Sequence, residues 1–283
     1  MKRGTFLRPH IIVLAVSVGS WLLLALDSPW HQIGEQRSFA LAAMLAVWGW
    51  ALWIVVATAL LVPSAVSLTA VRIVVPVAVV ASFIAVSPIS IFASLVMLMI
   101  CASGLFADTM VQGGAYGDEI RFTLRTPVPY MAPAVVVWLL LCGTMLAGTL
   151  FLAVQQWWLG APLTLVGALL ARYVPLRLHR LARRWLVVVP AGIVIHDHLV
   201  LAETIMCTKN NIAHITETAA AGETADFTGG VLGQRLSVQL RESDKVVLSR
   251  ITMKTLGTTE ALHVKAFSVA PRRLHAAMST ITR

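Results

Sequence analysis

Six apolar stretches between residues 11 and 174 of this 283-residue chain restrict it to folds that a lipid bilayer can hold. They are Ile11–Leu26, Phe39–Val62, Leu68–Val86, Ile89–Phe106, Pro133–Val154 and Trp158–Val174. About 20 helical residues cross a bilayer core about 30 Å thick, so each stretch predicts one membrane-spanning helix. A soluble helical domain would have to bury all of them, and the mean hydropathy of +0.82 argues against that alternative.

The basic residues between the apolar stretches predict the orientation of the chain. Alternate connecting segments contain Lys2, Arg3, Arg8, Arg72, Arg121, Arg125, Arg172, Arg177, Arg180, Arg183 and Arg184. The opposite connecting segments contain Arg37 alone. Because positive residues stay on the cytoplasmic side, we expect a multi-pass protein of a bacterial plasma membrane with both termini in the cytoplasm.

Two of the stretches leave alternatives open. The third contains Arg72 and Pro76, so it either spans the membrane while Arg72 extends to the headgroups or re-enters on the same side. The first begins after basic residues, as a signal peptide does. It ends in Leu24-Ala-Leu-Asp27, without small residues at both cleavage positions, which predicts an uncleaved anchor.

The net charge of +9 is concentrated in the membrane part, with +7 in residues 1–184 and +2 in residues 185–283. A nucleic-acid-binding protein would place its basic residues on the soluble part, so nucleic acid is not an expected partner. Anionic lipids of the inner leaflet are the expected partner, since each basic group near that surface contributes about 1 kcal/mol.

Residues 175–184 have apolar and basic residues on separate faces at helical spacing. One interpretation is a short amphipathic connector helix that lies along the inner leaflet. The other is a flank that simply continues the last span. In the first interpretation, lipid headgroups are contacted by Arg177, Arg180, Arg183 and Arg184.

From Trp185 onward, apolar and polar residues alternate with a period of two, which is typical of strands. The expected strands are Leu186–Val189, Ile193–Asp197, Leu199–Cys207, Asn211–Thr216, Arg235–Arg241, Lys245–Ile251 and Ala261–Ser268. Residues 222–233 predict a loop, residues 242–244 a turn, and Pro271 the first turn of a closing helix. We therefore expect a helical membrane bundle (1–174), the connector (175–184) and a cytosolic antiparallel β domain (185–283).

Two resemblances accompany this pattern. Through Arg184-Trp185, Gly192-Ile-Val-Ile195 and Asn211-Ile212, the last third resembles the bacterial pleckstrin-homology-like domains that follow membrane spans. Through Leu68-Thr-Ala-Val-Arg72 and Gly114-Ala-Tyr-Gly-Asp-Glu119, the whole chain resembles uncharacterised actinobacterial polytopic membrane proteins. These resemblances imply a fold and a location, and they imply no activity.

The most unusual polar segment is 107–133, between the fourth and fifth stretches. It places adjacent carboxylates beside arginines among several glycines, at Asp118, Glu119, Arg121 and Arg125. No Gly-Lys-Ser/Thr follows the glycines, so the segment is not a phosphate loop. It is either a connector whose opposite charges pair with each other or a loop that docks the cytosolic domain.

The sequence predicts no catalytic residues, no cofactor and no metal. His196 and His198 lie on one face of an extended strand, but zinc prefers three or four ligands. No ionisable side chain lies at the centre of a stretch, as a proton relay would require. The expected function is a membrane scaffold or accessory protein, whose partners include other membrane protein subunits. A small transporter or channel component and an enzyme acting on lipid headgroups are the alternatives.

Overall fold

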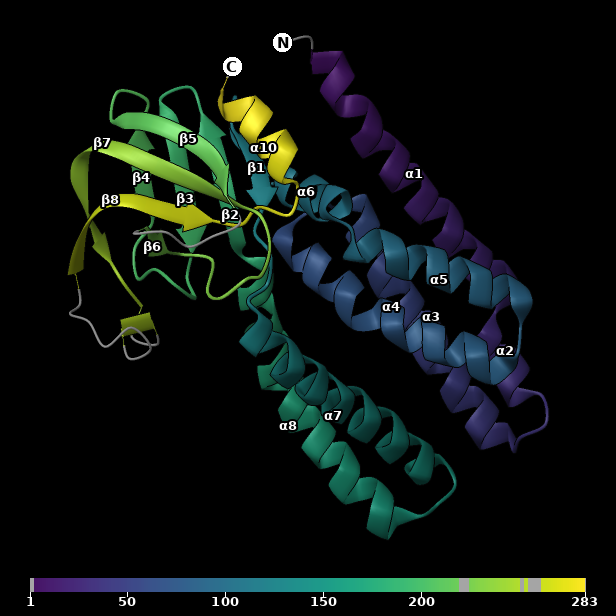
Figure 1. The fold of residues 1–283 in the computed structure, drawn as a ribbon. Helices are drawn as coiled ribbons and strands as arrows, with labels where there is room; N and C mark the ends of the chain where they lie inside the picture. The colour runs from purple at the N-terminus through teal and green to yellow at the C-terminus, as the bar shows by residue number, and fades with distance from the viewer. Residues whose placement is uncertain (1–2, 219–223, 250–251, 254–260, 283) are drawn as a thin grey trace. The chain divides into compact units, whose positions relative to one another are not determined.

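The computed structural model describes residues 3–218, 224–249, 252–253 and 261–282 (Figure 1). Lys2, the start of the predicted loop 222–233 and the end of the predicted strand 245–251 lie outside the described residues. The chain forms two compact units. The helical unit comprises the chain up to Gly113 together with Ala134–His179, and the β unit comprises Gly114–Pro133 together with the chain from Arg180.

The helices are mostly long and apolar. They are α1 (Arg3–Asp27), α2 (Pro29–Gly34), α3 (Phe39–Leu61), α4 (Ala65–Ala85), α5 (Pro88–Ala102), α6 (Gly104–Gln112), α7 (Val128–Ala153) and α8 (Trp157–Ala182). Among the described residues, five helices are long and apolar enough to cross a membrane, or six spans if the bent α5–α6 pair counts as one. This confirms a protein of five to six long apolar helices. The third predicted stretch forms α4, an uninterrupted helix despite Pro76.

Helices α5 and α6 meet at an angle of 69°. At the start of α5, the Ser90 hydroxyl donates to Oδ2 of Asp27, the last residue of α1, at 2.5 Å. At the end of α6, Gly113 lies so close to Pro63 that an added Cβ would be 2.3 Å from the Pro63 carbonyl oxygen. Pro63 follows α3, a helix of 23 residues and about 35 Å whose other end follows α1 and α2 in the chain. The bent pair therefore connects opposite ends of the helical unit.

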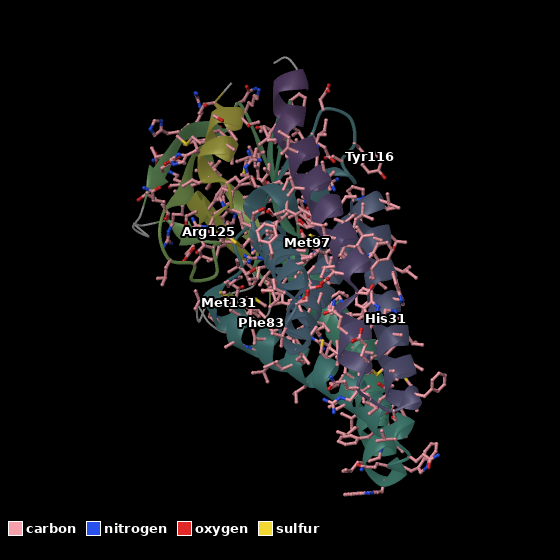
Figure 2. The ribbon with its side chains drawn as sticks, turned by 90° about the vertical axis from the view of Figure 1, so that its right-hand side faces the viewer. His31, Phe83, Met97, Tyr116, Arg125 and Met131 are labelled. Atoms are coloured by element: carbon pink, nitrogen blue, oxygen red, sulfur yellow. The ribbon has the colours of Figure 1, made fainter. Side chains whose placement is uncertain are left out.

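Apolar side chains cover the outside of the helical unit as well as its interior. Phe83 on α4 is 52% exposed, whereas Met97 on α5 is fully buried (Figure 2). Exposed apolar residues on helices of this length are typical of lipid-facing surfaces.

Helices α7 and α8 approach each other closely at glycines. A Cβ added at Gly148 would be 2.5 Å from the backbone nitrogen of Thr164, and one at Gly167 would be 2.9 Å from Cα of Met145. Small residues at such contacts let the backbones of membrane helices pack directly.

In its described residues, the β unit contains two four-stranded sheets and a closing helix. The first sheet is antiparallel and orders β1 (Ile120–Thr123), β2 (Arg184–Val189), β3 (Gly192–Asp197) and β4 (Ile205–Thr208). The second orders β5 (Ile212–Thr218), β7 (Arg235–Val247), β8 (Ala261–Val269) and β6 (Ala225–Asp226), with β6 parallel to β8. Both sheets and the closing helix α10 (Leu274–Ile281) contribute to one core, which includes Leu186, Val238, Phe267 and Leu274.

Strand β1 differs from the sequence-based expectation, because it comes from the segment between α6 and α7. It pairs along β2, and Phe122 in its centre is fully buried opposite Leu186. The predicted domain 185–283 therefore lacks one strand of its own sheet, and the β unit is built from two separate parts of the chain.

Two smaller differences lie in the second sheet and at its end. The predicted turn at 242–244 is wrong, because β7 runs without interruption from Arg235 to Val247 and accommodates the residues through a register shift between Gln239 and Asp244. Helix α10 begins at Leu274, while Pro271 forms an isolated bridge with Leu124.

Candidate anion-binding surface

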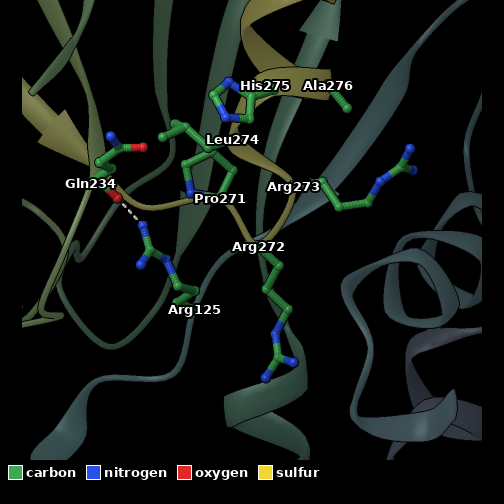
Figure 3. A pocket seen from close by; sticks show the side chains of 8 residues that line it. All are labelled: Arg125, Gln234, Pro271, Arg272, Arg273, Leu274, His275 and Ala276. Atoms are coloured by element: carbon green, nitrogen blue, oxygen red, sulfur yellow. Dashed lines mark hydrogen bonds between the residues drawn. The ribbon is translucent and has the colours of Figure 1, made fainter. Parts of the chain in front are cut away.

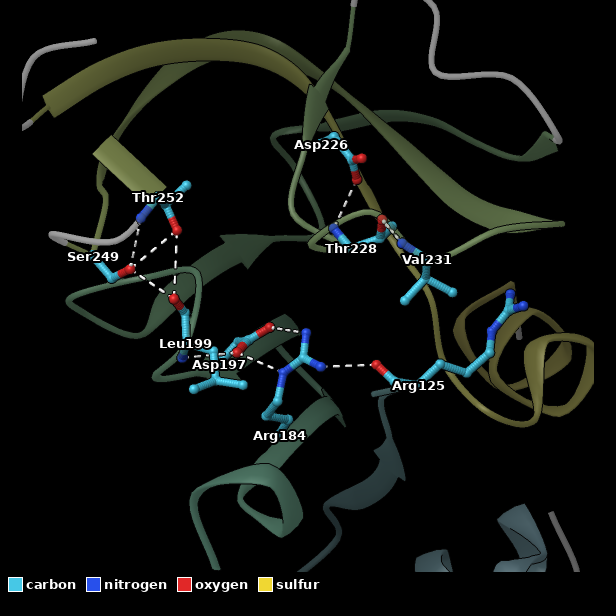
Figure 4. Close-up of polar contacts among 9 residues, drawn as sticks. All are labelled: Arg125, Arg184, Asp197, Leu199, Asp226, Thr228, Val231, Ser249 and Thr252. Atoms are coloured by element: carbon cyan, nitrogen blue, oxygen red, sulfur yellow. Dashed lines mark hydrogen bonds and ion pairs between the residues drawn. The ribbon is translucent and has the colours of Figure 1, made fainter. Parts of the chain in front are cut away.

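A buried ion pair joins the start of β2 to the end of β3 (Figure 4). Nε and Nη2 of Arg184 donate to the two carboxylate oxygens of Asp197 at 2.8 and 2.7 Å. Nη1 of Arg184 donates to the carbonyl oxygen of Arg125 at 2.8 Å. Arg184, two residues after the end of α8, is thus bonded to Arg125, three residues before the start of α7. The predicted headgroup contact of Arg184 is wrong, because its side chain is 1% exposed and its donors are used inside the β unit.

Next to this pair, basic and aromatic side chains gather on the outer face of the first sheet. Residues 122, 186 and 195 face the core, so their neighbours along each strand face outward. This group, here called the outer-face cluster, consists of Arg121, Arg183, Trp185, His196 and His198. Trp185 is paired with His196 across the strands. Their rings stack with centroids 4.9 Å apart, and the guanidinium carbon of Arg121 lies 5.4 Å from the Trp185 ring centroid.

The two histidines of the outer-face cluster are held in a positive environment. Their ring centroids are 4.2 Å apart. Burial, together with the neighbouring His198 and Arg183, lowers the pKa of His196 to about 4. Burial and Arg183 also lower the pKa of His198. Both causes disfavour the imidazolium form, so both rings are neutral at pH 7 in the absence of an anion.

The polar atoms of His196 are incompletely satisfied. Its Nδ1 lies 3.2 Å from the hydroxyl of Thr204. Its Nε2 is buried and has no hydrogen-bond partner among the residues that the structure describes. No group of three His, Cys, Asp or Glu side chains suited to a metal ion occurs in that part of the chain either. The positive charges of Arg121 and Arg183 beside the two rings suit this surface to an anion with oxygen acceptors.

The arginines of the predicted connector divide into two groups. Helix α8 continues without a break to Ala182, so residues 175–182 extend the last apolar helix and form no separate one. Arg177 and Arg180 are exposed on it. The positive charge of Arg180 also contributes to lowering the pKa of His198.

The residues of the predicted docking loop also have different surroundings. Oε1 of Glu119 accepts from Nη2 of Arg121 at 2.5 Å and from the backbone N–H of Tyr116 at 2.7 Å. Opposite charges of this segment thus pair with each other, while Asp118 is exposed. Arg121 and Arg183 thus lie in one cluster, although they come from two separate predicted groups.

Arg125 lies elsewhere, at a pocket of about 600 Å³ lined by Arg125, Gln234 and residues 271–276 (Figure 3). Its guanidinium donates to the carbonyl oxygens of Leu232 and Gln234. Burial and the nearby Arg235 lower the pKa of Arg125. Figure 3 shows Arg272 and Arg273 projecting away from Arg125 in different directions. The arginines around this pocket therefore do not converge on one ligand position.

The helical unit contains buried polar contacts that the sequence did not reveal. The hydroxyl of Thr109 donates to the carbonyl of Leu105, so it accepts from Nδ1 of His10, 2.7 Å away. Nε of Arg72 donates to the carbonyl of Cys101 at the end of α5, at 3.3 Å. These contacts join α1 to α6 and α4 to α5. Both contacts join residues far apart in the sequence, so no local sequence pattern predicts them.

From the sequence, His196 and His198 were considered only as metal ligands, and Trp185 was missed as part of a site. The pairing of β2 with β3 brings Trp185 to that face, because it sets Trp185 opposite His196. Comparison with known proteins finds no matching family, no matching curated protein and no matching solved structure.

Proposed function

We propose that this protein is an integral membrane scaffold of the bacterial plasma membrane that presents a β unit to the anionic inner leaflet. The β unit is pleckstrin-homology-like in this proposal, which its two sheets, single core and closing helix support. Both termini are cytoplasmic, which the distribution of arginines and the connection made by the α5–α6 pair support. Its partners are anionic lipids and other membrane protein subunits.

One observation carries the proposal: the outer-face cluster lies at the end of the first sheet where the chain enters from α8 and leaves towards α7. The last apolar stretch ends at Val174, and the eight following residues of α8 add about 12 Å. Arg183 comes directly after this helix. A cation within roughly that distance of the inner leaflet is attracted by its negative surface potential, which decays over about one Debye length.

The test compares the full-length protein in nanodiscs of phosphatidylglycerol and of phosphatidylcholine. Hydrogen exchange of residues 184–198 should be slower in the anionic discs, because headgroups cover the outer-face cluster. Arg183→Gln combined with His198→Gln should remove most of this difference. Arg241→Gln changes the charge of an exposed residue in the second sheet and should leave it intact. Equal exchange in the two kinds of disc would overturn the proposal.

Transport is the second candidate function, favoured by the contact between His10 and Thr109 inside the helical unit. If the protein is a transporter, ions should cross the membrane of proteoliposomes that contain it, and His10→Ala should reduce this flux. Unchanged flux in that variant would count against it.

A further inference from the structure

We propose that the outer-face cluster selects phosphomonoester groups over phosphodiester groups, and that a lipid such as phosphatidic acid is the source of the monoester. This inference rests on the proposed function, because it names the class of headgroup that the same surface prefers. Three features carry it: a pair of close imidazoles, exposed and half-buried arginines around them, and a buried nitrogen without a partner.

The arginines supply attraction without much selectivity. Arg183 is exposed at the edge of the outer-face cluster, whereas Arg121 is already held between Glu119 and the Trp185 ring. A guanidinium remains charged at every physiological pH and binds a phosphate oxygen of a diester as readily as one of a monoester. These residues therefore bring anionic headgroups to the surface and do not distinguish between them.

The imidazoles respond to the charge of the group that arrives. Positive neighbours and burial keep His196 and His198 neutral. A phosphomonoester has its second pKa near about 6 and carries about −1.5 to −2 at pH 7, with three terminal oxygens. A phosphodiester carries a single negative charge. The larger charge offsets the field of Arg183 more completely, so the imidazoles take up protons and donate charge-assisted hydrogen bonds.

The position of His196 makes it the inner contact of this pair. Its ring is fixed on one side by stacking on Trp185 and at Nδ1 by Thr204. Nε2 is covered from solvent, so it becomes a directed donor to the phosphate once it is protonated and the neighbouring exposed His198 ring moves aside. His198 is more exposed and meets the group first. The geometry gives a phosphate two imidazolium donors and one guanidinium on the same face.

The experiment titrates phosphatidic acid and, separately, phosphatidylglycerol into phosphatidylcholine nanodiscs that hold the full-length protein. The two series are matched in total lipid charge, and exchange of residues 184–198 reports binding. We expect half-maximal protection at about tenfold less phosphatidic acid at pH 7, the difference that one charge-assisted hydrogen bond supplies. The doubly substituted variant with His196→Gln and His198→Gln should bind both lipids with equal midpoints. His214→Gln, an exposed histidine of β5, is the matched control and should keep the preference.

Soluble glycerol phosphate, added to discs of phosphatidylcholine alone, distinguishes the source of the monoester. No protection at concentrations equivalent to the lipid supports the lipid source, whereas saturating protection would overturn it. Equal midpoints for the two lipids in the unaltered protein would overturn the inference and leave the scaffold proposal standing. Protection by neither lipid would overturn both.

Discussion

Arginines that are adjacent in the sequence can have different surroundings and different roles. Arg183 and Arg184 are indistinguishable in a count of positive charges, yet one is exposed and the other is fully engaged with Asp197. The sequence predicts a basic surface here, and the structure keeps part of it. Which arginine turns inward depends on strand register and on an acidic partner 13 residues later, so composition alone could not identify it.

The buried pair gives a sharp stability prediction. Arg184→Gln leaves the Asp197 carboxylate buried without its counter-ion, which lowers the free energy of unfolding of the β unit by about 3–5 kcal/mol. Arg183→Gln, the matched control, changes it by less than about 0.5 kcal/mol. Exchange rates of core amides such as Leu186 and Ile195 measure both effects. Similar rates in the two variants would show that the ion pair contributes nothing particular.

His196 makes the stability of the β unit depend on pH. Its folded pKa of about 4 lies below the ordinary value of 6.5, so the unfolded chain binds the proton more strongly. The contribution of His196 to the free energy of unfolding is fully present above about pH 6.5 and decreases between pH 6.5 and pH 4. Below about pH 4 this residue causes no further loss. His196→Gln should flatten this part of the stability profile, as unfolding measurements at stepped pH will register. A histidine titration by NMR with a midpoint near 6.5 would contradict the expectation.

At the element scale, long periodic segments were predictable and short ones were not. The apolar stretches correspond closely to α1, α3, α4, α7 and α8, because twenty residues of one character leave little ambiguity. Strand β1 has only four residues, Ile-Arg-Phe-Thr, and follows a segment rich in glycine. Its pairing with β2 is decided by residues about 60 positions away, and no local pattern contains that information.

The close packing of α7 against α8 predicts that a glycine substitution will lower the thermal stability of the helical unit. Gly148→Ala brings a methyl group 2.5 Å from a backbone nitrogen of α8, and backbone cannot move aside as a flexible side chain can. We expect the hairpin to open and the thermal transition in detergent to fall by several degrees. Gly143→Ala on the same helix meets nothing within 4 Å and should leave the transition unchanged. Equal transitions in both variants would mean that α7 and α8 do not rely on this contact.

For the whole molecule, the chain crosses the membrane six times if the α5–α6 pair counts as one span, which places both termini on the same side. A green fluorescent protein fused after Arg283 should then fluoresce, because it folds in the cytoplasm. Alkaline phosphatase inserted at Gln32, in the segment after α1, should be active because it lies outside. Active phosphatase fused after Arg283 would require one crossing fewer and a re-entrant α5–α6 pair.

The insertion of β1 into the sheet has a consequence for biosynthesis. The ribosome completes this strand before it makes α7 and α8, and its partner β2 emerges about 60 residues later. Until then Phe122 lacks the strand that buries it in the finished fold. In the topology proposed above, β2 reaches β1 after the α7–α8 hairpin has entered the bilayer and returned to the side of synthesis. In the proposed topology, closure of the first sheet therefore follows the insertion of the last hairpin.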